Sequence, residues 1–198
     1  MSAREDILAK LRVSSRPVPP PPPFVFAEIA DLAARFIEKA KVSIADVKEI
    51  ASESDCAAAV RQILKSGNEA LSLHIPAASP LLRFSWSAEG IDISHAPPSG
   101  TQTAFSRADF AVAETGTLVF LAGPQSPSSW HFRPGREIVL VRRSLLLPRL
   151  ENLFVRLREH TIPATVNLVT GPSRTADIEQ TIELGAHGPC AIHLLLAP

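Results

Sequence analysis

Two short segments of the sequence combine a glycine with side chains that could react with or bind a small molecule. The first is Glu114-Thr115-Gly116-Thr117, which separates two apolar runs. It places a carboxylate at the end of a predicted strand, where ligands bind in open α/β sheets. The neighbouring glycine can adopt backbone angles that other residues avoid. Glu114 is therefore a candidate base or nucleophile. The alternative is structural: Glu114 orders the turn or pairs with an arginine, while Thr115 and Thr117 serve the hairpin.

The second segment reads GPSRTADIEQ, beginning at Gly171. Its glycine and proline end a predicted strand, and Ser173 or Thr175 can cap the short helix that we expect to follow, up to Leu184. The first turn of a helix leaves backbone N–H groups unpaired and carries partial positive charge. With Arg174 adjacent, the segment is a candidate binding site for a carboxylate or phosphate.

The same segment also has a purely structural interpretation. Asp177 and Glu179 lie in the first turn of the predicted helix and supply negative charge there, so capping needs no ligand. His187 stands between two glycines just after the helix. It either pairs with the last helical carbonyls or, because the helix is short, reaches the region of Ser173.

Composition narrows the classes of function. The chain has 198 residues, of which 45% are hydrophobic, and its 20 basic residues balance 20 acidic ones. This length fits one domain, or one domain with a small appendage. The balanced charge provides no basic field for nucleic acid or an anionic membrane. We therefore expect neither as a partner.

The apolar runs are far shorter than the roughly 20 residues of a spanning helix, and no signal peptide follows Met1. A soluble, cytoplasmic protein is expected. The two cysteines, Cys56 and Cys190, form no C-x-x-C pair, and the histidines show no ligand spacing. We expect no disulfide framework, no metal site and no iron–sulfur cluster held by this chain alone.

Several cofactor motifs are missing from the sequence. The chain has no Tyr, and its last lysine is Lys65. It contains neither the G-x-x-x-x-G-K-[ST] motif of nucleotide-binding loops nor the G-x-G-x-x-G motif of nicotinamide enzymes. These absences disfavour a P-loop enzyme and a nicotinamide oxidoreductase.

The N-terminus is expected to form an arm, residues 1–23, ahead of a main domain at 24–198. Ser2 to Arg12 shows the pattern of a short amphipathic helix. The five prolines Pro19–Pro23 favour an extended polyproline conformation. They act either as a stiff spacer, which is the simpler interpretation, or as a docking site for a proline-binding module.

Apolar periodicity predicts alternating helices and strands in the main domain. Helices are expected at 28–41, 54–65, 148–159 and 175–184, with a short one beginning at 79. Strands are expected at 42–47, 71–75, 91–94, 108–114, 117–121, 137–141, 165–169 and 191–196. This alternation predicts an α/β fold with a Rossmann-like, largely parallel sheet and helices on both faces.

Three segments carry a resemblance to a known family. The strings ADFAVAETGTLVF, EIVLV and GPSRTADIEQTIELGAHGP resemble the LUD domain of the lactate utilisation protein C family. The resemblance is strong over Ala108–Pro198 and weaker over the N-terminal half. One departure concerns the segment before EIVLV, where the family usually has an acidic residue and a histidine. This chain has Arg136-Glu137 at that place.

The resemblance implies a fold related to the sugar-isomerase, CoA-transferase and formyltetrahydrofolate cyclo-ligase group. It also implies a role in oxidising L-lactate to pyruvate with two partner proteins that carry the iron–sulfur clusters. A cyclo-ligase would be expected to show a G-x-G-x-G-x-Y-D segment, which is absent here.

Two hypotheses follow. In the first, the chain is a subunit of a lactate-oxidising complex that binds no cofactor itself, and it binds a small anion or a partner near Glu114, Arg174 and His187. The expected ligand-binding residues are Thr115, Gly116, Ser173, Arg174, Thr175 and His187. In the second, the chain is a free-standing enzyme of the CoA-transferase or isomerase type. Related CoA-transferases use a glutamate, and Glu114 would be the reacting carboxylate.

Overall fold

Six parallel strands form the central sheet of the computed structural model, which describes residues 3–14, 26–159, 163–175, 183–185 and 188–198. Every strand pair in this sheet is parallel, which confirms the predicted parallel core. The strands follow the order β1 (Asp46–Glu49), β12 (Ala191–Ala197), β7 (Arg136–Arg142), β4 (Thr103–Arg107), β2 (Ser72–His74) and β3 (Asp92–Ser94).

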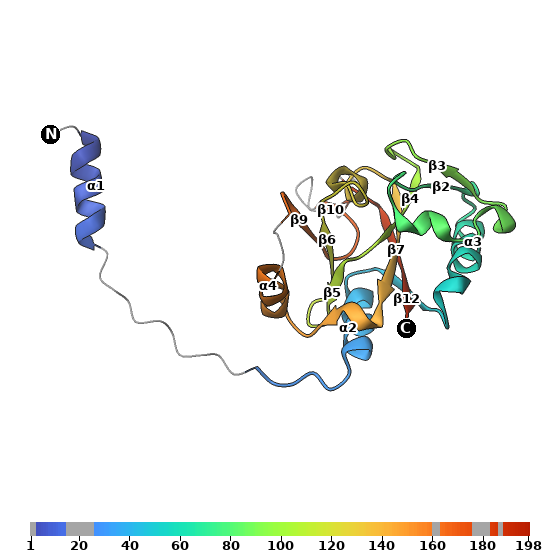
Figure 1. Ribbon diagram of the computed structural model, residues 1–198, viewed down its shortest axis with the longest axis horizontal. Coiled ribbons are helices and arrows are strands. Elements are labelled where there is room, and N and C mark those ends of the chain that lie inside the picture. The colour runs from blue at the N-terminus through green and yellow to red at the C-terminus, as the bar shows by residue number, and fades with distance from the viewer. Residues whose placement is uncertain (1–2, 15–25, 160–162, 176–182, 186–187) are drawn as a thin grey trace.

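Helices cover both faces of this sheet (Figure 1), as the sequence predicts. On one face lies α2 (Leu32–Val42), and on the other lies α3 (Cys56–Ser66). The sequence of strand β7 explains why both faces of the sheet must be covered. Its odd-numbered Val139 and Val141 share a core cluster with α2, while Ile138 and Leu140 share one with α3. Because successive strand residues point to opposite faces, a continuous apolar run must be buried on both sides.

Local hydrogen bonds define both ends of helix α2. The Asp31 side chain accepts a bond from the backbone N–H of Ala34, 2.9 Å away, and caps the N-terminus. At the other end Ile44 adopts a φ of 65°, and the N–H of Ala45 bonds the carbonyl of Ala40. The predicted strand at 42–47 therefore starts later, at the first residue of β1.

A second sheet lies beside the first and contains four strands in the described part of the chain. Its order is β8 (Leu146–Leu147), β5 (Phe110–Val112), β6 (Thr117–Leu121) and β9 (Val166–Val169). The pairs β5–β6 and β6–β9 are antiparallel, and β5–β8 is parallel. One face of this sheet joins the core cluster of α2 and the central sheet through Ala111, Leu118 and Phe120.

The other face of the second sheet packs against α4 (Leu150–Arg158) (Figure 1). Leu153 and Leu157 face the sheet and cluster with Val112 and Val119. Phe154 of the same helix is 52% exposed. The helix packs on a single layer, so only a narrow stripe of its surface is covered.

The helix expected at 175–184 is wrong at both of its described ends. Strand β10 (Arg174–Thr175) pairs antiparallel with β11 (Glu183–Leu184). Residues 176–182 lie outside the described chain. The backbone of Ser173 donates to the Pro189 carbonyl over 2.8 Å and accepts from the Gly185 N–H over 3.0 Å. Ser173 was predicted as a possible cap at the start of this helix, and its backbone instead bonds to a returning segment.

The other described elements are short. Strand β4 is missing from the sequence-based expectations because its central residues, Ala-Phe-Ser, show no sustained apolar pattern. The 3-10 turns are η1 (Glu53–Asp55), η2 (Pro80–Arg83), η3 (Ser87–Glu89), η4 (Ser128–His131) and η5 (Arg143–Leu145). Of these, η1 leads directly into α3.

The N-terminal helix predicted in the arm is present as α1 (Ala3–Ser14). The side chains at residues 3–10 are exposed. The proline run lies outside the described residues, so the division of the chain at residue 23 stays a prediction. Among the helices that the structure describes, none has both the length and the apolar character needed to cross a membrane.

Candidate functional site

The turn that carries Glu114 connects β5 to β6 and packs against the end of α2. Gly116 has a φ of 72°, and a Cβ atom there would lie 2.6 Å from the backbone nitrogen of Ala40. Only glycine combines that backbone angle with so close an approach. The turn therefore fits the predicted need for glycine, and the need arises from packing against a helix.

Glu114 forms an ion pair with Arg149, whose Nε lies 3.1 Å from Oε1 of the carboxylate. Arg149 also donates to the carbonyl of Ala27 over 2.6 Å and lies 4.5 Å from the ring centroid of Phe26. The Arg149 side chain is 13% exposed and that of Glu114 is 40% exposed. This geometry corresponds to the alternative in which Glu114 pairs with an arginine and orders its turn.

The hydroxyl groups of the same turn form a row with that of Thr170, the residue after β9. Thr115 Oγ1 lies 2.7 Å from Thr117 Oγ1, which lies 2.7 Å from Thr170 Oγ1. The next residue, Gly171, has a φ of 72°, and a Cβ atom there would lie 2.1 Å from the Ser43 carbonyl oxygen. Two glycine turns thus meet the same end of α2, and the threonine hydroxyls bond one another between them.

After Gly171, the described residues of the second predicted segment pair with Glu183–Gly185 and Pro189. Ser173 lies beside Gly188, where a Cβ atom would come within 3.2 Å of the serine Cβ. Arg174 is exposed on β10, and the backbone of Thr175 belongs to the same strand. His187 lies outside the described residues. Within the described chain, the Glu114 side chain pairs with Arg149 and forms no hydrogen bond or ion pair with Ser173 or Arg174.

A cavity of about 610 Å³ opens beside Gly188, at the amino edge of the central sheet. Its walls come from the segments that precede four different strands. Glu69 precedes β2, Thr101 precedes β4, Gly135 precedes β7 and Cys190 precedes β12. Because all these strands are parallel, their amino ends meet at one edge. Sequence reasoning missed this cavity because its parts lie far apart along the chain.

Two arginines and one glutamate give the cavity one net positive charge. Arg133 is exposed, and Arg136 is the first residue of β7. Arg136 Nη1 lies 2.8 Å from Glu69 Oε1, without the alignment of a hydrogen bond, and its buried Nε has no partner in the described chain. An arginine with unused donors suits a carboxylate or phosphate. In the sequence, the one sign of this cationic cavity is the motif Arg-Pro-Gly-Arg, which directly precedes an apolar strand.

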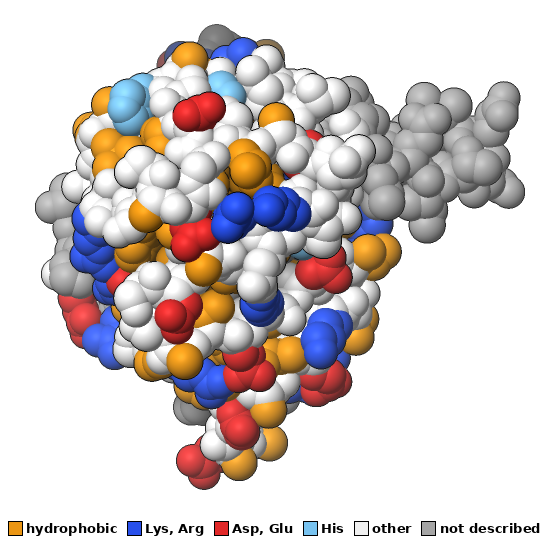
Figure 2. Space-filling model, turned by 90° about the vertical axis from the view of Figure 1, so that its right-hand side faces the viewer, with side chains coloured by type: hydrophobic (Ala, Val, Ile, Leu, Met, Phe, Trp, Pro, Cys, Tyr) orange, Lys and Arg blue, Asp and Glu red, His pale blue; other side chains and the backbone are white. Residues whose placement is uncertain are grey.

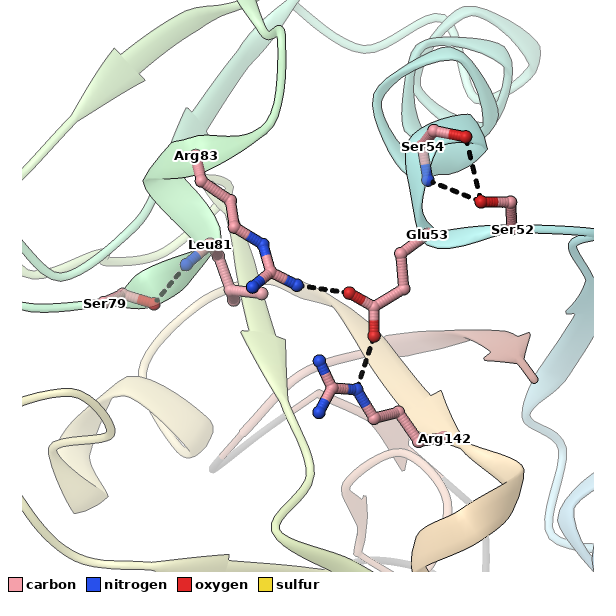
Figure 3. A network of polar contacts seen from close by, with 7 residues as sticks. All are labelled: Ser52, Glu53, Ser54, Ser79, Leu81, Arg83 and Arg142. Carbon is pink, nitrogen blue, oxygen red and sulfur yellow. Dashed lines mark hydrogen bonds and ion pairs between the residues drawn. The ribbon is translucent and has the colours of Figure 1, made fainter.

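The opposite edge of the sheet is closed by ion pairs (Figure 3). Glu53 bridges Arg142, at the end of β7, and Arg83, on η2. A hydrogen bond from Arg142 is the main cause that lowers the pKa of Glu53. Glu49, at the end of β1, pairs with Arg143. These arginines are engaged within the protein.

Two further observations concern the Cys56 thiol and the charges on one face of the protein. Burial raises the pKa of the Cys56 thiol to about 12, which keeps it protonated and unreactive near neutral pH. On the face drawn in Figure 2, basic and acidic side chains are interspersed. The residues that the structure describes contain no group of three His, Cys, Asp or Glu side chains placed to hold a metal ion.

A buried polar cluster was also missed by sequence reasoning. His131 and Glu137 are fully covered, and their side chains meet with Nδ1 2.7 Å from Oε1. Ser126 lies 2.9 Å from the other ring nitrogen of His131, and Ser106 lies 2.6 Å from Glu137 Oε1. The sequence marked Arg136-Glu137 as a departure from the family pattern. It gave no indication that Glu137 would meet a histidine.

These features define an α/β protein with a parallel central sheet, a second mixed sheet and a cavity at the amino edge. A model described as the LUD domain matches residues 99–197, which are 99 of the 198 residues. The chain belongs to the LUD-domain family. The matched region runs from the segment before β4 to the last residue of β12, and it includes most of the cavity wall.

Several curated relatives carry the name lactate utilization protein C. Lactate utilization protein C of Geobacillus sp. (strain WCH70) is 32% identical over 126 residues, covering 55% of this chain and 52% of that protein. Uncharacterized protein YkgG of Escherichia coli (strain K12) is 30% identical over 95 residues, covering 45% of this chain and 41% of that protein. The chain spans about half the length, or less, of these curated relatives.

A solved structure shares the fold. The crystal structure of a DUF162 family protein from Deinococcus radiodurans superimposes with a TM-score of 0.64 and covers 87% of this chain and 100% of that one. The sequence identity is 19%, so the similarity establishes the architecture alone.

Proposed function

We propose that this chain is a subunit of a lactate utilisation system and supports the oxidation of L-lactate to pyruvate. The family match over residues 99–197 carries the proposal, together with the names of relatives such as lactate utilization protein C of Geobacillus sp. (strain WCH70). In this proposal the iron–sulfur clusters that accept electrons belong to partner proteins, and this chain binds no cofactor itself.

The cavity at the amino edge is the proposed binding site for a small carboxylate of this pathway. Arg133 and Arg136 supply the positive charge, and a planar guanidinium pairs well with a carboxylate. Thr101 lines the same cavity and offers a hydroxyl group to the ligand. The volume of about 610 Å³ lies within the range of small-molecule sites and exceeds the needs of a three-carbon acid. Bound water or a larger carboxylate would fill the remaining space.

Only some of the ligand-binding residues expected from the sequence belong to this proposed site. Ser173 stays in the proposed site because it adjoins Gly188 in the cavity wall. Arg174, Thr175 and His187 stay as proposed contributors from the same segment. Thr115 and Gly116 belong to the turn against α2, and in this proposal they hold the second sheet in place.

Growth and co-purification test the subunit role. Deleting the coding sequence in the native host should slow growth on L-lactate and leave growth on glucose unchanged. A tagged chain isolated from lactate-grown cells should bring down proteins that contain iron and acid-labile sulfide. Normal growth of the deletion strain on L-lactate would contradict the proposal.

The competing hypothesis is a free-standing enzyme of the CoA-transferase or isomerase type with Glu114 as the reacting group. Its carboxylate is held by Arg149, which opposes attack on a substrate because the negative charge is already paired. The purified chain should therefore catalyse neither the transfer of CoA between carboxylic acids nor the isomerisation of sugar phosphates. Turnover that is lost in Glu114→Gln would favour the enzyme hypothesis instead.

A further inference from the structure

Three side chains between the two sheets are linked one to the next in the arrangement of a proton relay. Ser126 Oγ lies 2.9 Å from His131 Nε2, and His131 Nδ1 lies 2.7 Å from Glu137 Oε1. A hydroxyl, an imidazole and a carboxylate linked in this way are the signature of an activated nucleophile, whatever the fold. The lactate proposal makes no use of this cluster.

The backbone holds Ser126 in a defined position at the surface. Gly123 and Ser126 exchange two backbone hydrogen bonds, of 3.2 and 3.0 Å, across a tight turn. Ser126 is half-buried, and Pro127 follows it and restricts the backbone further. The hydroxyl therefore sits on a rigid turn that solvent reaches, directly above a buried histidine.

The ring of His131 is held in one orientation by packing. Its ring stacks on Phe120 of β6, with ring centroids 3.7 Å apart and planes 15° apart. When Glu137 is ionised it can only accept a hydrogen bond, and a neutral His131 then carries its proton on Nδ1, facing Glu137. The Nε2 lone pair is then directed at Ser126, as a general base requires.

Glu137 is held in turn by Ser106 of the neighbouring strand. Ser106 Oγ donates to Glu137 Oε1 over 2.6 Å, while Oε2 is buried with no hydrogen-bond partner in the described chain. Burying a carboxylate with one oxygen unpaired is costly. An imidazolium formed beside this carboxylate would be stabilised by its charge. The cluster is thus arranged for the state in which His131 has taken a proton.

We propose that Ser126 is a nucleophile that hydrolyses small acyl esters or thioesters. His131 is its general base, and Glu137 is a positioning residue. Ser126 Oγ bonds to the acyl carbon as its proton passes to His131 Nε2, and that proton leaves with the departing alcohol or thiol as the ester bond breaks. Water then attacks the acyl-serine through the same base, releases the acid and restores the hydroxyl. No co-reactant besides water is needed.

A covalent probe tests this directly on the full-length protein. A fluorophosphonate should form an adduct at Ser126, located by intact mass and peptide mapping, and Ser126→Ala should abolish it. Ser129, an exposed serine three residues on, supplies the matched control: Ser129→Ala should label at the wild-type rate. Absence of an adduct at Ser126 in the folded wild-type protein overturns the proposal, whether or not the lactate role holds.

The relay itself is tested with p-nitrophenyl acetate. We expect Glu137→Gln to lower kcat by about tenfold or more with KM unchanged, because the base loses its orientation and its counter-charge. If Glu137→Gln does not fold, Ser106→Ala replaces it, since that variant removes one hydrogen bond and should lower kcat about threefold. A folded variant with wild-type kcat overturns the positioning role of Glu137.

Discussion

The two edges of the central sheet are built in different ways. At the carboxyl edge, Glu53 joins Arg142 and Arg83, and Glu49 pairs with Arg143. At the amino edge, the segments before four strands enclose a cavity, and Arg136 keeps an unpaired buried Nε.

This difference runs against the usual pattern. In open α/β sheets ligands normally bind beyond the carboxyl ends of the strands. In this protein Arg83, Arg142 and Arg143 at the carboxyl edge are already paired with carboxylates, so they have little remaining capacity for an external anion. The charge available for a ligand lies at the other edge, where small residues let four loops approach. The proposed carboxylate site therefore departs from the topological rule, because it was chosen by the charges that are available for a ligand.

The largest loss of stability is expected where the loops that carry Gly135 and Gly100 meet at the amino edge. A Cβ atom on Gly135 would lie 2.3 Å from the carbonyl oxygen of Gly100, and backbone atoms cannot move aside cheaply. We expect Gly135→Ala to lower the free energy of unfolding by about 3 kcal/mol. The measurement is urea unfolding followed by circular dichroism.

Gly123 supplies the matched control for this substitution. A Cβ atom there would meet nothing within 4 Å, and neither glycine has a positive φ. We expect Gly123→Ala to change the stability by less than about 1 kcal/mol. Equal losses in the two variants would show that the amino edge does not depend on this contact.

The next effect concerns the ion pairs of the carboxyl edge. Glu53→Ala leaves Arg142 and Arg83 without their shared partner, and the Glu53 side chain is only 22% exposed. Allowing for solvent screening, we expect a loss of about 1 kcal/mol. The comparison is Glu49→Ala, whose carboxylate is 55% exposed and whose removal should cost less than about 0.5 kcal/mol. If the larger loss came from Glu49, the account of this edge would be wrong.

The Glu53 carboxylate also makes the folding stability depend on pH, and we expect this effect to be smaller. The pKa of Glu53 is lowered from 4.5, first by its hydrogen bond with Arg142. A lowered folded-state pKa contributes stability that is present above pH 4.5 and is lost as pH falls through the folded-state value. The midpoint temperature of thermal unfolding should therefore fall more steeply below pH 4.5 in the wild type than in Glu53→Gln. Parallel pH profiles would exclude this contribution.

Much of the architecture could be predicted from the sequence. The runs EIVLV and the apolar stretch of β12 are buried on both faces, which is why they indicate parallel core strands. The string beginning at Gly171 identified the family correctly and its local structure wrongly. Its helical pattern there was overridden by backbone bonds between Ser173 and the segment at Gly185 and Pro189.

The candidate sites were much harder to predict. Glu69, Gly100 and Gly135 form one cavity only after the strands align, and no spacing along the chain encodes that meeting. Glu137 looks like a charged residue at a strand end, yet it is fully buried because His131 and Ser106 reach it from other segments. Pairing between distant residues is set by tertiary packing, which a local pattern does not record.

The most direct test of the account is an NMR titration of the ¹⁵N-labelled protein with L-lactate. We predict chemical-shift changes for the backbone amides at the amino edge, at Arg133, Gly135 and Cys190, and their loss in Arg136→Gln. Residues at the carboxyl edge, such as Arg142, should not respond. Changes centred on the carboxyl edge, or the same changes in Arg136→Gln, would contradict the assignment of the carboxylate site to the amino edge.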